Sequence, residues 1–283
     1  LRDAGIEVPI HVFTETFALL LSEQAAARGL RAAVQLKLDT GMHRVGLLAD
    51  DVPDAIRALR DLPGLEIEGA WSHLAVADVP DHPFTRKQVE LFENLTGRIE
   101  ASGIQLRYRH IANSAATLST PETHFDMVRC GVACYGLWPG SALEGSAPLR
   151  PALALRALVV MSKVVPAGDG LSYGLEYHLE RSGNVITVGA GYADGYDRRL
   201  SGTADVLLHG RRHRVSGVVC MDQFLVDVGD RASDVGDVVT LLGADGDENI
   251  SAEELAAHIG TINYEVTTRI PSRVPRVYLE GES

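Results

Sequence analysis

The sequence predicts an α/β fold in its first half and a mainly β fold in its second half. Up to about residue 136, apolar strand-like segments alternate with amphipathic helical segments, which is the pattern of a parallel sheet covered by helices. A loop-like stretch at 141–151 ends this alternation. After it, the apolar runs are short, rich in β-branched residues and separated by turn-forming residues, as in a small barrel or sandwich. We therefore expect two domains, at 1–148 and 149–283.

The alternating half contains about five strands with helices between them. We expect strands at 10–14, 32–40, 65–75, 106–113 and 126–136, and helices at 15–29, 51–64, 82–103 and 115–120. The longest of these helices has apolar residues at helical spacing. Gly29 closes the first helix, and Gly64 follows the second. A closed (β/α)8 TIM-type barrel needs eight strands and roughly 250 residues. Either the sheet is open, or some barrel units are absent from this sequence.

The second half has the pattern of a β domain with one helix. We expect strands at 154–165, 184–191, 204–210, 213–228 and 237–243. Turn signals such as PAGDG and GADGDE separate them. The helix is expected at 251–261, where Ser251 is the N-cap and Glu254 completes a capping box.

Composition excludes several classes of protein. The 283 residues are 46% hydrophobic and 23% charged, which is ordinary for a globular chain that buries a core. The net charge of -12 argues against binding to nucleic acid or to an anionic membrane surface, and no apolar run reaches the ~18 residues that span a bilayer. The cysteines Cys130, Cys134 and Cys220 lie in apolar contexts. We expect them to be reduced, buried thiols of a cytoplasmic protein, with no zinc or other metal site.

Polar side chains follow the apolar part of successive strands in the first half. Ligands of parallel α/β folds bind at the carboxyl ends of the strands, so this placement favours an enzyme. The residues concerned are Asp39, Thr40, Ser72, His73, Asn113, Ser114 and Arg129.

Nine motifs stand in a fixed order along the chain: KLDTGMHRVG, WSHLAVAD, HIANSAAT, VRCGVACYG, SYG, GYADGYDRRL, VVCMDQ, TINYEV and RVPR. With these motifs the chain resembles the alanine racemase family from about residue 10 to residue 279. The resemblance implies a pyridoxal 5'-phosphate (PLP) enzyme with an N-terminal (β/α)8 TIM-type barrel, the PLP-binding domain, and a mainly β C-terminal domain. It also implies a homodimer whose active sites are shared between subunits, and the interconversion of L-alanine and D-alanine, which supplies D-alanine for peptidoglycan.

Racemisation removes an α-proton and returns one to the opposite face, so it needs an electron sink and two bases. Tyr173 of SYG matches the catalytic tyrosine of the family, one of those two bases. His73 and Arg129 match the histidine and arginine that give this tyrosine a positive environment. Arg129 also matches the arginine that faces the pyridine nitrogen of PLP. Because arginine stays protonated, it leaves that nitrogen unprotonated and disfavours transamination.

The resemblance further implies how PLP and the substrate are held. Ser114 begins a short helix and matches a phosphate ligand, for which a hydroxyl at a helix start is suited. Gly131 and Val132 match further backbone donors to the phosphate, and Asn113 matches a position near the cofactor. The residues at the substrate mouth, which the family takes from the partner subunit like the catalytic tyrosine, are matched by Tyr192, Met221 and Asp222.

In KLDTGMHRVG, Arg44 matches the arginine that binds the substrate carboxylate, and Lys37 matches a lysine that the family carbamylates. A carbamate is an anion, and it would orient the guanidinium of Arg44 by charge-assisted hydrogen bonds. The alternative for Lys37 is an unmodified ion pair with Asp39.

Two departures from the family pattern bear on function. None of Lys37, Lys87 and Lys163 matches the lysine that forms the Schiff base with PLP. The opening residues 1–5 have the composition of a helix end. We expect ~90 residues to precede them, because a barrel without its first strands exposes an unpaired sheet edge. Ser272 stands where the family often has a tyrosine that restrains the cofactor. A racemase of broader or serine specificity, or a non-catalytic remnant that binds an anion or a protein, are the alternative functions.

Overall fold

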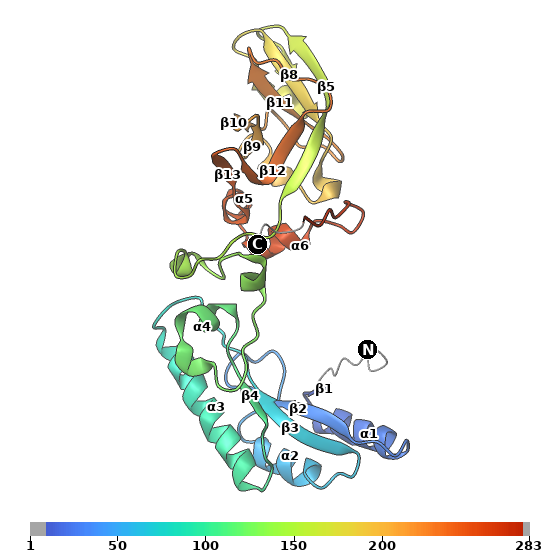
Figure 1. The fold of residues 1–283 in the computed structure, drawn as a ribbon, viewed down its shortest axis with the longest axis vertical. Helices are drawn as coiled ribbons and strands as arrows, with labels where there is room; N and C mark the ends of the chain where they lie inside the picture. The colour runs from blue at the N-terminus through green and yellow to red at the C-terminus, as the bar shows by residue number, and fades with distance from the viewer. Residues whose placement is uncertain (1–9, 280–283) are drawn as a thin grey trace. The chain divides into compact units, whose positions relative to one another are not determined.

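The computed structural model describes residues 10–279, and the helix end expected at 1–5 lies outside them. The chain divides between Arg150 and Pro151 into two compact units, here called unit 1 and unit 2 (Figure 1). Each unit has its own sheet and its own packed interior, and each is described by itself.

Unit 1 contains a four-stranded parallel sheet in the order β1-β2-β3-β4. Successive strands are connected by a helix, and these helices flank the strands (Figure 1). The central strand β2 is almost entirely buried, because it is covered on both faces, as is usual for parallel sheets. The strands are β1 (Ile10–Val12), β2 (Ala32–Lys37), β3 (Leu65–Trp71) and β4 (Tyr108–His110), and the helices are α1 (Glu15–Ala26), α2 (Val52–Leu59) and α3 (Pro83–Ala101).

The helix α3 shows why these segments pack as they do. Its residues Phe92, Leu95 and Ile99 are completely buried and recur every three or four positions, so they form one stripe along the helix. His82 caps the first turn, since its Nδ1 accepts a hydrogen bond from the backbone N–H of Phe84 at 3.1 Å. The first four expected strands and the first three expected helices of the sequence are all present, although both the strands and the helices are shorter than expected.

The fifth strand expected at 126–136 is wrong. This segment is a loop followed by a 3-10 turn, η3 (Val132–Tyr135), and it lies beside the short helix α4 (Ser114–Ser119). The backbone N–H of Gly131 donates to the side chain of Ser114 rather than to a neighbouring strand. As a result Cys130 and Cys134 are exposed, not buried as expected of strand residues.

Unit 2 is mainly β, as the sequence predicts. A seven-stranded antiparallel sheet has the order β10-β9-β12-β5-β8-β11, with β13 paired to β12, and β6 and β7 form a separate hairpin. The strands are β5 (Leu155–Val165), β6 (Gly170–Leu171), β7 (Tyr177–His178), β8 (Gly183–Val188), β9 (Asp205–Leu208), β10 (Arg211–Arg214), β11 (Phe224–Gly229), β12 (Val238–Asp245) and β13 (Glu248–Ile250).

Two helices close this unit, although the sequence predicts only the first. In α5 (Ala252–Ile259), Ser251 is the N-cap, and its Oγ accepts from the N–H of Glu254 at 3.0 Å. The reciprocal half of the expected capping box is missing because the carboxylate of Glu254 binds Arg212. The second helix, α6 (Asn263–Thr268), has only six residues, too few to show a helical period. Within 10–279, no helix combines the length and the apolarity that crossing a membrane demands.

Candidate active site

Residues at the ends of β3 and β4 gather around the guanidinium of Arg129. One of its terminal nitrogens donates to the carbonyl of Ser72 at 2.7 Å and to Nδ1 of His73 at 3.2 Å, and the other donates to Nδ1 of His110 at 2.7 Å. No carboxylate of residues 10–279 forms an ion pair with it. Burial lowers the pKa of Arg129 to about 10, so it remains a cation at neutral pH, with only neutral partners.

A buried relay fixes the protonation of His110. The amide nitrogen of Gln35 donates to the carboxylate of Glu68 at 3.4 Å, so its oxygen faces Nε2 of His110, 2.8 Å away. That oxygen can only accept, and Nε2 therefore has the proton. The other ring nitrogen is left to accept from Arg129. Burial and the charge of Arg129 lower the pKa of His110 to about 3, so the ring is neutral.

His73 is held in the same tautomer. Its Nδ1 accepts from Arg129, so its proton is on Nε2. Burial, followed by the charges of Arg129, Arg44 and Lys37, lowers the pKa of His73 to about 4. The expectation that His73 and Arg129 together supply positive charge is thereby corrected, because the imidazole is uncharged and Arg129 is the cation of the pair.

The motif KLDTGMHRVG folds back on itself so that its two ends meet. Leu47 N–H donates to the carbonyl of Lys37 at 2.9 Å, and Asp39 N–H donates to the carbonyl of Leu47 at 2.8 Å. A Cβ on Gly46 would lie 2.7 Å from Cγ of Lys37, and the φ of Gly46 is +118°. The last residue of the motif is therefore a glycine because the side chain of its first residue occupies that space.

Lys37 is buried, with 2% of its surface exposed. Its Nζ donates to the carbonyl of Leu38 at 2.6 Å and lies 5.3 Å from the ring centre of Trp71. Burial, together with the charges of Arg129 and Arg44, outweighs Asp39 and lowers the pKa of Lys37 to about 8. An amine in this range is partly neutral, and therefore nucleophilic, near neutral pH.

Asp39 is not the ion-pair partner of Lys37 that the alternative interpretation required. Its carboxylate accepts from the N–H groups of Gly41 at 2.9 Å and His43 at 3.1 Å, and it also contacts Nδ1 of His43. Burial raises the pKa of Asp39, but these hydrogen bonds outweigh burial and lower it overall. Asp39 thus shapes the turn, and Arg44 projects from that turn with its side chain exposed.

The segments expected to hold a phosphate lie together in unit 1. Oγ of Ser114 accepts from the N–H of Gly131 at 2.8 Å and of Ala133 at 3.4 Å. Asn113 caps α4, since its Oδ1 accepts from Ala116 N–H at 3.0 Å. The N–H of Val132, between the two donors to Ser114, makes no hydrogen bond with any residue of 10–279.

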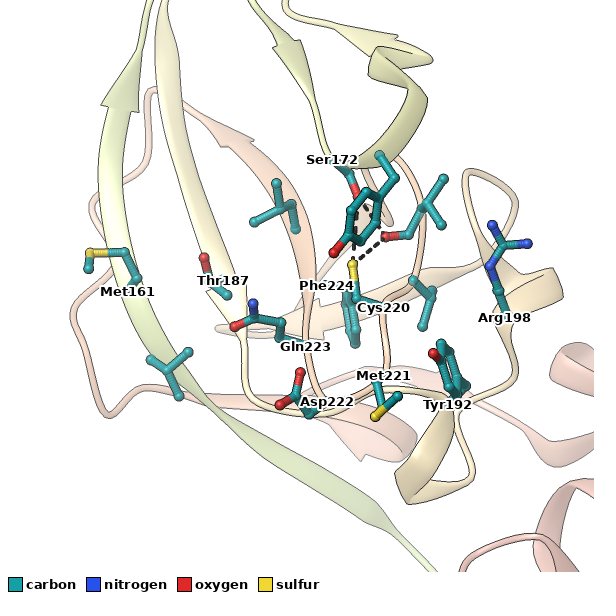
Figure 2. Close-up of a pocket in the computed structure, with 15 residues that line it drawn as sticks. Met161, Ser172, Thr187, Tyr192, Arg198, Cys220, Met221, Asp222, Gln223 and Phe224 are labelled. Carbon is teal, nitrogen blue, oxygen red and sulfur yellow. Dashed lines mark hydrogen bonds between the residues drawn. The ribbon is translucent and has the colours of Figure 1, made fainter.

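Unit 2 contains an open pocket of about 830 Å³, here called the tyrosine pocket (Figure 2). Tyr173, Tyr192, Met221 and Asp222 all line it, and Figure 2 shows the side chains of Tyr192 and Met221 close together at its edge. Tyr173 is 73% exposed. Its position depends on Ser172, which has a φ of +62° and donates from Oγ to the carbonyl of Val218 at 2.8 Å.

The structure thus groups the predicted site residues into two sets, one in each unit. In the unit 1 set, Arg129 contacts Ser72, His73 and His110, and Ser114 contacts Gly131. The unit 2 set lines the pocket that contains Tyr173. Ser272 lies exposed in the loop after α6. The sequence interpretation missed Gln35, Glu68, Trp71 and His110, although a glutamine and a histidine within buried strands were a signal, since buried polar groups need partners.

Comparison with known proteins links both units to one family. The family model "Alanine racemase, N-terminal domain" matches residues 2–139, and "Alanine racemase, C-terminal domain" matches residues 152–278. The alanine racemase of Salinispora tropica is 42% identical over 283 residues, which cover 99% of this chain and 75% of that protein. The alanine racemase of Desulfovibrio desulfuricans is 43% identical over 270 residues, which cover 95% of this chain and 72% of that protein.

Solved structures agree with these matches. The alanine racemase of the D-cycloserine producer Streptomyces lavendulae has a TM-score of 0.93 and 40% identity, covering 100% of this chain and 81% of that one. The alanine racemase of Streptomyces coelicolor A3(2) has a TM-score of 0.91 and 38% identity, covering 97% of this chain and 73% of that one. The predicted fold class, a TIM-type α/β part followed by a mainly β domain, is confirmed.

Proposed function

The chain belongs to the alanine racemase family, and on that premise we propose that it interconverts L-alanine and D-alanine by a two-base reaction that supplies D-alanine for peptidoglycan. It is an isomerase, since curated relatives that match almost all of it at 42–43% identity are alanine racemases. The broader-specificity, serine-specific and non-catalytic alternatives are not favoured. A cytoplasmic location accords with this role.

PLP is the proposed cofactor, and when bound it supplies the electron sink that makes the α-proton of an amino acid removable. The observation that supports this best is Arg129, a cation whose partners among residues 10–279 are all neutral. A pyridine nitrogen is a neutral acceptor, and it suits a guanidinium that has no carboxylate partner. The free N–H of Val132 and the hydroxyl of Ser114 likewise suit a phosphate, with Gly131 and Asn113 beside them.

Arg129 and His73 prepare the proton transfer. Arg129 stays charged and donates, so an acceptor facing it remains unprotonated. His73 is neutral with its proton on Nε2, which makes that nitrogen a donor. We propose that Nε2 of His73 donates a hydrogen bond to the phenol oxygen of Tyr173 from the partner subunit. This hydrogen bond, and the charge of Arg129 beyond it, favour the phenolate that removes the α-proton.

Arg44 is assigned to the substrate carboxylate, and Lys37 is assigned as the residue that positions Arg44. The charge of Arg44 lowers the pKa of both Lys37 and His73, so its guanidinium lies within electrostatic reach of the other unit 1 residues. The neutral amine of Lys37 attacks carbon dioxide, forms a C–N bond and releases one proton, which yields a carbamate. That anion would hold Arg44 in position by charge-assisted hydrogen bonds.

A homodimer with shared active sites is proposed because the resemblance to the family implies it, and the two sets of residues, which lie in different units of the chain, would then meet across the subunit interface. Tyr192, Met221 and Asp222 would come, like Tyr173, from the partner subunit and form the mouth through which alanine enters. The exposure of Tyr173 and Met221, 73% and 59%, agrees with side chains that are covered only on assembly.

The test is conversion of L-alanine to D-alanine by the purified whole protein with PLP, followed by an enzymatic D-amino-acid assay. A visible absorbance band that borohydride abolishes would show covalent attachment of the cofactor. L-serine assayed in parallel distinguishes the broader-specificity alternative. A protein that binds PLP but racemises neither amino acid would overturn the proposal.

A further inference from the structure

We propose that Asp197 and Arg269 form a latch that positions Tyr192, and that this latch sets the affinity of the pocket for its amino acid. The inference rests on the proposed role of Tyr192 at the substrate mouth. It assigns Asp197 and Arg269 as positioning residues, which act through Tyr192 without touching the substrate.

Backbone contacts hold one side of the loop at residues 191–197, here called the Tyr192 loop. Tyr192 begins the 3-10 turn η6 (Tyr192–Asp194), and its N–H donates to the carbonyl of Cys220 at 3.0 Å. Ala193 N–H donates to the carbonyl of Met221 at 2.9 Å. A Cβ on Gly191 would lie 2.4 Å from the carbonyl oxygen of Cys220. The loop is therefore pressed directly against the segment that supplies Met221 to the pocket.

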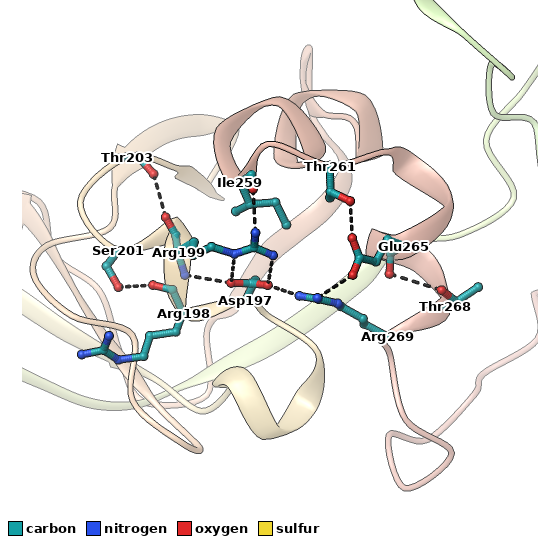
Figure 3. A network of polar contacts seen from close by, with 10 residues as sticks. All are labelled: Asp197, Arg198, Arg199, Ser201, Thr203, Ile259, Thr261, Glu265, Thr268 and Arg269. Atoms are coloured by element: carbon teal, nitrogen blue, oxygen red, sulfur yellow. Dashed lines mark hydrogen bonds and ion pairs between the residues drawn. The ribbon is translucent and has the colours of Figure 1, made fainter. Parts of the chain in front are cut away.

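The other side of the loop is held by charge. Asp197 accepts from Nε and a terminal nitrogen of Arg199, at 3.0 and 2.9 Å, and it also binds Arg269 of the segment after α6 (Figure 3). Asp194 forms a second link to the same C-terminal segment, 2.9 Å from Arg273. Gly195 lies between these links, and with a φ of +95° it brings the loop so close that a Cβ would be 2.8 Å from the carbonyl of Arg269.

The charges of this cluster balance, because two arginines, Arg199 and Arg269, contact two carboxylates, Asp197 and Glu265. Glu265 binds the second terminal nitrogen of Arg269 at 2.6 Å, and Arg199 donates to the carbonyl of Ile259 at the end of α5 at 2.8 Å (Figure 3). Only 11% of the Asp197 side chain is exposed. Two arginines on one partly buried carboxylate make strong charge-assisted hydrogen bonds. Loss of Asp197 would therefore remove the contact with Arg269 and free the guanidinium of Arg199, which carries the link to α5, while the Asp194–Arg273 contact would remain.

The latch lies beside the tyrosine pocket. A neighbouring hollow of about 400 Å³ is lined by Tyr192, Gly195, Asp197, Arg198 and Arg269. Tyr192 and Arg198 line this hollow and the tyrosine pocket alike. A displacement of the latch therefore moves the wall of the pocket itself.

The experiment compares Asp197→Asn and Arg269→Gln with Arg212→Gln in the PLP-loaded protein. Arg212 anchors α5 through a similar cluster, with contacts to Glu248 at 2.9 Å and Glu254 at 2.6 Å, but it lines neither pocket. We expect the two latch variants to raise KM for alanine about tenfold with kcat changed less than about twofold, because ground-state and transition-state binding are lost equally. Arg269→Lys should recover part of the loss, and Arg212→Gln should leave KM unchanged.

Hydrogen exchange gives a readout that does not depend on catalysis. The amides of Tyr192 and Ala193 should exchange faster in Asp197→Asn and Arg269→Gln than in the parent, and at the parent rate in Arg212→Gln. Equal thermal destabilisation by all three variants, with no difference in KM or in exchange at residues 191–197, would overturn the latch. If the parent protein does not racemise alanine, the proposed function fails, while the exchange rates still decide whether the latch holds the loop.

Discussion

His73 accepts a hydrogen bond from Arg129 at 3.2 Å through Nδ1, and this contact determines which atom of the imidazole can act. Since arginine can only donate, the proton of His73 is on Nε2. Burial and the charges around it lower the pKa of His73 to about 4. At neutral pH the guanidinium of Arg129 is therefore charged, whereas the imidazole of His73 is neutral and can donate a hydrogen bond through Nε2.

Replacement of Arg129 by glutamate should reverse this electrostatic arrangement. An anion in place of the guanidinium favours a protonated cofactor nitrogen and thereby transamination, so racemisation should fall by at least ~100-fold while pyruvate accumulates. Both products are measured by enzymatic assay. Arg86→Glu, the same change at an exposed position of α3, is the control. Unchanged racemisation in Arg129→Glu would show that the guanidinium does not face the cofactor.

Tyr173→Phe should abolish racemisation in at least one direction and leave cofactor binding intact. The variant keeps the ring but removes the oxygen that exchanges the proton. Rates are measured separately from L-alanine and from D-alanine, together with the visible absorbance of the bound cofactor. Tyr278→Phe, at a tyrosine that is 90% exposed, should have parent rates. Parent rates in Tyr173→Phe as well would exclude the phenol as a base.

Acid should destabilise unit 1 through His110. Its pKa is about 3 in the folded chain and 6.5 otherwise, so the unfolded state binds more protons between these values. The contribution of His110 to stability is therefore complete above pH 6.5 and declines as the pH falls towards 3, by at most on the order of 5 kcal/mol. Denaturant unfolding as a function of pH measures this slope. His110→Gln keeps one donor and one acceptor but cannot titrate, so its slope should be shallower, and an identical slope would assign the effect to other groups.

Gly46→Ala should destabilise the protein and displace Lys37. The new Cβ would meet Cγ of Lys37 at 2.7 Å in a backbone conformation of φ +118°, and we expect a loss of roughly 2–4 kcal/mol. Gly103→Ala isolates the backbone contribution, because Gly103 has a φ of +94° and no atom within 4 Å of its Cβ position. Thermal unfolding compares the two variants. Equal losses of stability in the two variants would mean that the side chain of Lys37 moves away from the new Cβ without destabilising the protein.

Carbamylation of Lys37 should depend on carbon dioxide and on pH. With a pKa of about 8, the neutral amine becomes more abundant as the pH rises through 8, so the modified fraction should increase with pH at a fixed concentration of dissolved carbon dioxide. Carbon-13 NMR with labelled bicarbonate detects the carbamate, and Lys37→Ala should remove its signal. A signal that persists in this variant would assign the carbamate to another amine.

The order of secondary structure up to residue 113 could be predicted because local signals specify it. The apolar strands and the apolar stripe of α3 depend on neighbouring residues only. The segment at 126–136 has the same apolar, β-branched character, yet its N–H groups bind Ser114, 17 residues earlier. Since that partner lies outside the segment, no local pattern could reveal the loop. The short helix α6 could not be predicted either, because six residues are too few to show a helical pattern of apolar residues.

For the candidate site, the identity and order of the residues could be read from the chain alone, and they match Arg129, His73, Ser114 and Tyr173 to one family pattern. Their charges and tautomers depend on the folded protein. The neutral His73, the tautomer of His110 and the lowered pKa of Lys37 all result from burial and from partners distant along the chain. Gln35 and His110, for example, are 75 residues apart. Charge and tautomer follow from the solvent and neighbours that folding supplies, and a linear sequence contains neither.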